Sequence, residues 1–253
     1  MPHISLAAEI VTRIAGFPIS NALITTWLVM GFLIIISYLA TRDLKSVPGN
    51  GQSIAEMIVG GLYDFFSTVT GKYVDLVFPL VASLFIFILA ANWVGLLPGV
   101  GTVGFFHGEE FTPLLRGATA DLNTTVALAL FAMITIQYFG FKTSGMHYGK
   151  RFLNFASPIF FFLGLLELIS EVSKIISFAF RLFGNIFAGE VLLAVMAFLM
   201  PFIVPLPFIT MELFVGFIQA LVFSMLTAVF LTVAVAHGEH EKLVSEGGGL
   251  HHG

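Results

Sequence analysis

Hydrophobic positions in this chain form long continuous runs separated by short polar or turn-forming segments. The run at residues 22–40 contains no charged side chain. Its length is close to the roughly 20 residues that a helix needs to cross a bilayer. Similar or longer runs predict four further crossing helices, at residues 76–97, 122–141, 155–200 and 208–236.

Residues 53–72 show a different pattern, in which apolar side chains recur on one helical face. Ser53 and Glu56 have the spacing of a capping box, which predicts that a helix begins at Ser53. Asp64 and Lys72 lie off the apolar face, so we expect an amphipathic helix in the membrane interface rather than a crossing helix. The apolar positions are Ile54, Met57, Ile58, Leu62, Phe65, Phe66 and Val69.

The composition supports a membrane location. Hydrophobic residues make up 58% of the chain and charged residues 10%, whereas soluble domains contain roughly 25% charged residues. So little charge cannot cover a surface that faces water. The expected fold is an all-α integral membrane protein with five crossing helices and one interfacial helix, in a single membrane domain over residues 1–253.

Several classes of chemistry are unsupported by the sequence. The net charge of −4 argues against a nucleic-acid partner. The chain has no cysteine, which excludes disulfides and thiolate catalysis. We expect no metal site and no cofactor, and we expect the charged residues 237–253 to form a flexible tail.

Basic residues divide the connecting segments into two classes. The loop at 98–121 holds one basic residue, Arg116, and the turn at 201–207 holds none. Basic residues gather instead in the loops at 41–49 and 142–151. Because basic loops stay on the cytoplasmic side, we expect the N-terminus outside and the C-terminus inside. The basic residues of the two inner loops are Arg42, Lys45, Lys142, Lys150 and Arg151.

The 155–200 segment is too long for an upright crossing. A helix of that length would extend about 69 Å at 1.5 Å per residue, whereas the hydrocarbon core is about 30 Å thick. The segment is therefore strongly tilted, or broken near Gly184 or Gly189. The 208–236 segment is also long, so we expect a tilted hairpin that follows a neighbouring object in the membrane plane.

Five polar side chains follow one face of this long segment. At about 100° per residue they lie within an arc of roughly 80°, and Glu190 lies on a different face. The five are Glu167, Glu171, Lys174, Arg181 and Asn185. The first three have the spacing of a local ion-pair set. That explanation leaves them a purely structural role.

Arg181 is harder to explain locally, because no acidic residue lies three or four positions away. An arginine at the centre of a crossing helix costs about 2.5–3.5 kcal/mol on insertion scales. We therefore expect its partner on another helix or on another subunit. Charged residues in such positions are functional by default.

Glu212 and Gln219 share a face of the last crossing segment, and Gly216 between them would let a helix or water approach. The predicted topology places Glu190 and Glu212 on the same outer side. Neither of their helices has a basic residue at that end. The two carboxyl groups suggest a proton relay; the alternative is a protonated pair that only joins two helices.

One motif has a recognisable pattern. RLFGNIFAGE at residues 181–190 follows Ser177 and, seven residues before the arginine, Lys174. Together with DLNTT at residues 121–125 and the glutamine of FVGFIQALVFSMLT, it resembles the a subunit of the membrane sector of F-type ATP synthases. The resemblance extends from about residue 22 to 236, and Gly184 and Glu190 are typical of its bacterial members.

The resemblance implies a role for each polar residue. Arg181 would face a rotating ring of c subunits, supported by Asn185 and Gln219, and Glu190 would line an outer aqueous half-channel. The position of Glu212 is a histidine in some members, so the order of proton hops stays open. Candidates for the inner half-channel are Glu167, Glu171, Lys174 and Ser177.

The resemblance also implies the setting. The chain would be a non-catalytic, ion-translocating subunit of a bacterial inner-membrane F1Fo complex, alongside the c ring and b-type peripheral stalk subunits. A competing hypothesis is a self-contained ion channel or secondary transporter, but the internal repeats usual in transporters are not found. An intramembrane enzyme is disfavoured because the crossing segments lack histidine and cysteine constellations.

Overall fold

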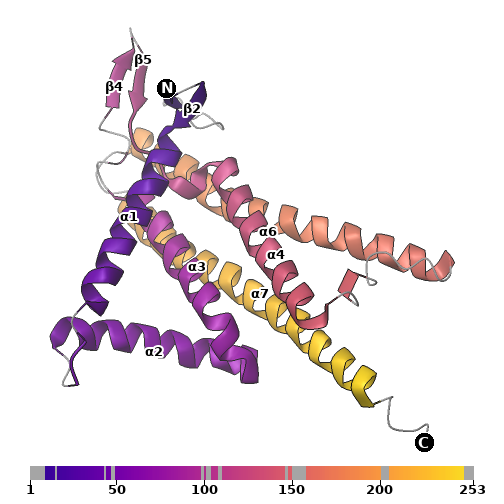
Figure 1. Ribbon diagram of the computed structural model, residues 1–253. Helices are drawn as coiled ribbons and strands as arrows, with labels where there is room; N and C mark the ends of the chain where they lie inside the picture. The colour runs from indigo at the N-terminus through magenta and orange to yellow at the C-terminus, as the bar shows by residue number, and fades with distance from the viewer. Residues whose placement is uncertain are drawn as a thin grey trace, which may run out of the picture.

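The structure is a computed structural model that describes residues 9–14, 16–42, 44–46, 49–97, 100, 104–107, 110–145, 148–149, 158–200 and 205–247. Six long helices dominate the described chain (Figure 1). They are α1 (Asn21–Thr41), α2 (Asn50–Thr70), α3 (Val74–Gly95), α4 (Leu122–Ser144), α6 (Pro158–Leu199) and α7 (Pro205–Gly247).

Five helical stretches are long and apolar enough to cross a membrane, at 21–41, 50–95, 122–143, 158–199 and 205–236. This confirms the predicted class of an all-α protein with five crossing helices. The second stretch is α2 followed by α3, and it bends at Gly71, whose φ of +54° favours glycine. Figure 1 shows α2 lying across the lower ends of α1 and α3.

The start of α2 corrects one prediction. The helix begins at Asn50, and the Ser53 amide donates a hydrogen bond to the Gly49 carbonyl, so Ser53 lies inside the first turn and is not the cap. Glu56 accepts from the Gln52 side chain at 2.7 Å instead of reaching back to Ser53. The capping-box spacing was misleading because Asn50, Gly51 and Gln52 also adopt helical geometry.

The core lies where α3, α4 and α7 pack together, and only the middle of α6 joins it. The rings of Phe178 in α6 and Phe223 in α7 meet edge to face with centroids 4.9 Å apart. Small residues such as Ala129, Ala132 and Ala220 are fully buried, which lets the helices approach closely, as is typical of helix packing in membranes.

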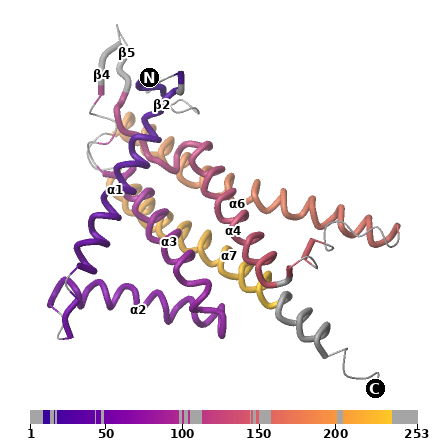
Figure 2. Tube along the Cα trace, viewed as in Figure 1, coloured from indigo at the N-terminus to yellow at the C-terminus, as the bar shows by residue number. Residues whose placement is uncertain are grey.

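The long segment that sequence analysis left as tilted or broken is one continuous helix, α6, over Pro158–Leu199. It forms a hairpin with α7, and its first half projects away from α3 and α4 (Figures 1 and 2). That half exposes apolar side chains that the described part of the chain leaves uncovered. They include Ile159, Phe160, Phe162, Leu166, Ile169, Val172, Ile176 and Phe180.

The end of α7 also differs from expectation, because its helix continues past residue 236 to Gly247. The first part of the tail is therefore helical rather than flexible. Glutamate, lysine and leucine between residues 239 and 246 favour helix, and the glycine run that begins at Gly247 ends it. The rest of the predicted tail, residues 248–253, lies outside the described residues.

Two short hairpins lie outside the helices, one before α1 and the other in the segment predicted as an outer loop. Strand β1 (Ile10–Ile14) pairs antiparallel with β2 (Phe17–Ser20), and β4 (Gly104–His107) with β5 (Glu110–Pro113). Both hairpins lie at the end of the molecule where α6 turns into α7 (Figure 1). They position the polar residues of that end.

Candidate functional site

The Arg181 side chain is exposed on α6, as is the side chain of its neighbour Phe180. Its Nη2 donates a hydrogen bond to the Ser177 hydroxyl, 3.2 Å away and one turn earlier. Among the described residues no acidic side chain forms an ion pair with it. The guanidinium charge is therefore available to a group outside this chain.

A polar bridge joins α6 to α7 one turn beyond Arg181. The Asn185 side-chain amide donates to the Gln219 Oε1 atom at 2.6 Å. Gln219 is buried, and its Nε2 has no hydrogen-bond partner among the described residues. The structure thus brings Asn185 and Gln219 together one turn along α6 from Arg181, and the joint role expected of the three residues stays a prediction.

The acidic and basic residues toward the start of α6 pair locally. Glu171 accepts from the Lys174 ammonium at 2.7 Å, and the same ammonium lies 4.8 Å from the centre of the Phe230 ring in α7. Glu167 is half-buried one turn before Glu171. Glu171 and Lys174 therefore form the local ion pair that their spacing suggested, whereas the Ser177 hydroxyl accepts a hydrogen bond from Arg181.

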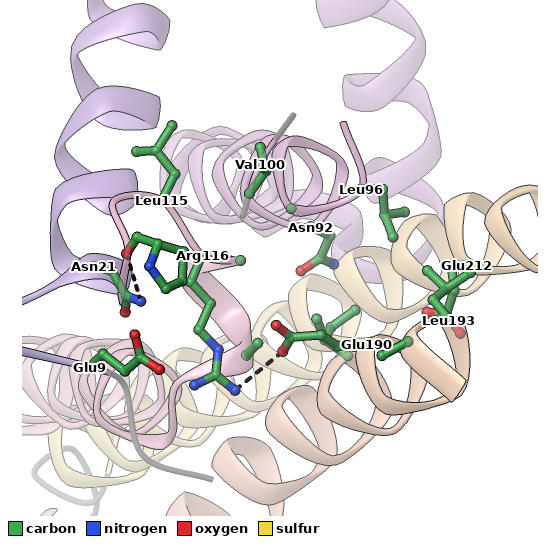
Figure 3. Close-up of a pocket in the computed structure, with 16 residues that line it drawn as sticks. Glu9, Asn21, Asn92, Leu96, Val100, Leu115, Arg116, Glu190, Leu193 and Glu212 are labelled. Atoms are coloured by element: carbon green, nitrogen blue, oxygen red, sulfur yellow. Dashed lines mark hydrogen bonds and ion pairs between the residues drawn. The ribbon is translucent and has the colours of Figure 1, made fainter. Parts of the chain in front are cut away.

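A second set of polar side chains lines a cavity of about 320 Å³, at the end of the molecule where the β-hairpins lie (Figure 3). Its wall includes Glu190 from α6, Glu212 from α7, Asn92 from α3 and Arg116 from the segment before α4. The two carboxyl groups that sequence analysis placed on one side of the membrane therefore share a cavity. Arg181 is not part of its lining.

Glu212 is buried and lies against the backbone of α6 at Gly189. A Cβ added at Gly189 would overlap the Glu212 carboxylate. Glycine at this position is therefore a steric requirement for the observed Glu212 position.

Arg116 supplies the basic partner that the two helices lack. Its Nη2 donates to the Glu190 Oε2 atom at 3.3 Å, and the arginine side chain is only 8% exposed. The sequence analysis found no basic residue at this end of either helix, and the partner of Glu190 comes instead from the segment before α4. The one signal in the sequence was that Arg116 is the sole basic residue of the outer loop.

Asn92 is a further residue that sequence analysis missed. It is buried in α3, donates to the Gly216 carbonyl at 2.9 Å and accepts from the Thr119 hydroxyl at 2.7 Å. A Cβ added at Gly216 would come within 3.2 Å of the Asn92 Cβ atom. Gly216 thus lets α3 approach α7 closely.

The match to known proteins covers both the residues around Arg181 and the carboxyl groups of the cavity. The family model of the ATP synthase A chain matches residues 23–232. The chain belongs to this family. The matched range includes Arg181, Glu190, Glu212 and Gln219, and it ends before the last part of α7.

Curated relatives agree with the family match. ATP synthase subunit a of Geotalea daltonii is 38% identical over 222 residues, which are 87% of this chain and 89% of the relative. The subunit a of Geotalea uraniireducens has the same identity and coverage. ATP synthase subunit a 3 of Pelobacter propionicus is 38% identical over 215 residues, 84% of this chain and 86% of the relative.

Proposed function

We propose that this chain is the stator subunit of a proton-translocating F-type ATP synthase in a bacterial inner membrane. Its partners would be a ring of c subunits, b-type peripheral stalk subunits and the rest of the F1Fo complex. The N-terminus would lie outside and the C-terminus inside, because the basic loops stay in the cytoplasm. The chain would move protons and would catalyse no covalent reaction itself.

One observation carries this proposal: Arg181 is exposed on α6 and has no acidic partner among the described residues. A charge exposed on an apolar helix face is costly in lipid. A passing ring of carboxylates would offset that cost. The uncovered apolar side chains along the first half of α6 support a protein neighbour beside this part of the helix.

The arginine can act in two ways. A guanidinium keeps its charge at physiological pH, so it stabilises the ionised form of any ring carboxylate that comes near and favours release of its proton. The same positive charge repels protons, and it keeps two half-channels from joining. Protons must then ride the ring from one half-channel to the other, which couples their flow to rotation.

The outer half-channel is the cavity lined by Glu190, Glu212, Asn92 and Arg116. Its volume of about 320 Å³ is sufficient for several water molecules. The inner half-channel would start at the other end of α6, with Glu167, Glu171, Lys174 and Ser177 as its polar residues. Asn185 and Gln219 connect the two helices beside Arg181 and hold its surroundings in place.

The decisive test is Arg181→Ala in the assembled complex. We expect ion-driven ATP synthesis to fall to background while the complex still assembles, because the alanine cannot discharge ring carboxylates. Arg42→Ala, which removes an exposed arginine at the end of α1, is the matched control and should leave synthesis near its normal rate.

Two results would contradict the proposal. Coupled synthesis retained in Arg181→Ala would remove the arginine from the mechanism. Purification in mild detergent as a functional homomer, without a ring of small hairpin subunits, would favour the stand-alone channel or transporter instead.

A further inference from the structure

Two consecutive side chains of α3, Asn92 and Trp93, reach across to the backbone of α7. The Asn92 side-chain amide donates to the Gly216 carbonyl at 2.9 Å, and the Trp93 indole Nε1 donates to the Leu213 carbonyl at 3.1 Å. The two carbonyls are three residues apart, which is less than one turn of an α-helix. Neighbouring residues of α3 therefore hold α7 at two points within a single turn.

The hydrogen bond of Trp93 is an additional tie between the two helices. Trp93 lies near the end of α3 and is 42% exposed, and tryptophan is common at membrane interfaces because its ring is apolar while its N–H can stay in water. In this chain the N–H is directed at a carbonyl inside α7. Helix geometry already gives that carbonyl the amide four residues later, and its second lone pair accepts the indole N–H.

The residue next to Leu213 is Glu212, whose side chain lines the outer cavity and is 4% exposed. Among the described residues, no hydrogen bond or ion pair holds its carboxylate. Its position therefore depends on the stretch of α7 backbone that carries it and on Gly189, against which it packs. Whatever fixes that backbone also fixes where the carboxylate lies.

Close packing limits the movement of α7 at this level on two sides. An added Cβ would overlap Glu212 if placed at Gly189 of α6, and it would come within 3.2 Å of the Asn92 Cβ atom if placed at Gly216. Packing of this kind keeps α7 from moving sideways between α3 and α6. Sliding of α7 along its axis and rotation about it are opposed by the two hydrogen bonds from α3.

We propose that Trp93 is a positioning residue for Glu212, whose indole N–H fixes the rotation and depth of α7 so that the carboxylate stays at the outer cavity. Its bond is the nearer of the two ties, since Leu213 adjoins Glu212 and Gly216 is four residues away. The indole itself is only a hydrogen-bond donor and relays no proton. This inference rests on the proposed function, because it requires Glu212 to take part in proton transfer.

The other charged side chains that line this cavity are Glu9 before β1, Arg116 before α4 and Glu190 in α6, whereas α3 contributes the neutral Asn92. A carboxyl group binds its proton more or less readily according to its distance from such charges and from water. A substitution at Trp93 alters none of these charges. A change in pH dependence would therefore report a change in the position of Glu212.

The test uses the whole complex in membrane vesicles stripped of the soluble ATPase, with passive proton conductance measured against the pH of the outer side. Trp93→Phe keeps an aromatic ring and removes the N–H. We expect conductance to fall about threefold, the factor that corresponds to an average interhelical hydrogen bond in a membrane. We also expect the outer pH of half-maximal conductance to shift.

Two further substitutions separate the N–H from the volume of the ring. Replacement of Trp93 by 3-benzothienylalanine, in which sulfur takes the place of the N–H, should reproduce the effect of phenylalanine; normal conductance with this isostere would show that ring volume matters and would overturn the inference. Trp27→Phe is the matched control, because the other tryptophan of the chain is 53% exposed on α1 and lies outside the cavity wall. It should conduct as the unmodified complex does.

A double variant separates positioning of Glu212 from general helix packing. In a Glu212→Gln background, Trp93→Phe should cause no further shift of the pH profile, because the group that it positions no longer titrates. An equal shift in both backgrounds would overturn the inference. The amount of assembled complex in the membrane is measured for every variant, and conductance is expressed per complex.

The outcomes also distinguish this inference from the proposed function. If Glu212→Gln slows conductance while Trp93→Phe leaves both the rate and the pH profile unchanged, only the positioning role of Trp93 is overturned. If Glu212→Gln itself conducts normally, Glu212 has no place in the outer half-channel, and that part of the proposed function falls together with this inference.

Discussion

Two arginines in this chain have opposite surroundings. Arg116 is 8% exposed and bonds to Glu190 within the same chain. Arg181 is exposed and bonds only to a neutral hydroxyl among the described residues. The comparison shows that arginines in a membrane protein can have different roles. The charge of Arg116 is paired within the chain, whereas the charge of Arg181 is available to a partner subunit.

The cavity and the exposed face of α6 around Arg181 also have opposite surroundings. The cavity gathers carboxyl groups, amides and a paired cation from six parts of the chain. The face around Arg181 is apolar apart from a short polar group. A polar cavity can admit water and pass protons, whereas an apolar face with one unpaired cation can attract a carboxylate and block protons.

The strongest test of this difference is a variant in which Arg181 gains an acidic partner within its own helix. Ser177→Asp would place a carboxylate one turn away, where the hydroxyl now accepts its hydrogen bond at 3.2 Å. We expect coupled ATP synthesis to fall about tenfold or more, since roughly 1.4 kcal/mol of internal pairing lowers a rate by that factor.

The control for this change is Ser177→Asn, which has a similar shape and no charge. It should reduce synthesis far less, as measured in energised vesicles. Equal losses in the two variants would show that shape, rather than charge, matters at this position.

A smaller effect is expected when the cavity is disturbed without changing its charge. Gly189→Ala would push the Glu212 carboxylate from its place, because the added Cβ would overlap it. We expect passive proton conductance to fall several-fold while Arg181-dependent binding to the ring persists.

Glu212→Gln provides the comparison for this variant, because it removes the charge and keeps the volume. It should slow proton flux more than it weakens binding to the ring. Normal conductance in vesicles that contain Glu212→Gln would argue against a relay role for this residue.

The smallest effect on conduction should come from Asn92→Ala, which removes the two hydrogen bonds that tie α3 to Gly216 and Thr119. Interhelical hydrogen bonds in membranes contribute modestly, so we expect a loss of about 1–2 kcal/mol in stability. Thermal inactivation of the purified complex would detect it. A much larger loss of proton flux than of stability would place Asn92 on the proton path.

The five crossing helices were predictable because a helix that crosses lipid needs about 20 consecutive, predominantly apolar residues. The polar stripe of Arg181 and Asn185 was predictable for a related reason, since helical periodicity alone puts these residues on one face. The first turn of α2 was not, because helix ends depend on backbone hydrogen bonds that spacing signals only suggest.

The β-hairpins and the ion pair between Arg116 and Glu190 could not be predicted from the sequence, for another reason. These two residues are 74 positions apart, and no local pattern reports a contact of that range. Glu9 is a stronger case, because it enters the cavity only through the pairing of β1 with β2 and the bonds of Asn21.

By itself, the sequence determined that this protein crosses a membrane, how many times it does so, and which side chains share a helical face. It also contained the motif at residues 181–190, because its ten residues are consecutive in the chain. Only the tertiary structure decided that Glu190 and Glu212 share one cavity, that Arg116 pairs with Glu190, and that Arg181 has no acidic partner among the described residues. The reason is physical: burial in lipid acts residue by residue, whereas counter-ions are assigned by the packing of helices and hairpins distant in the chain.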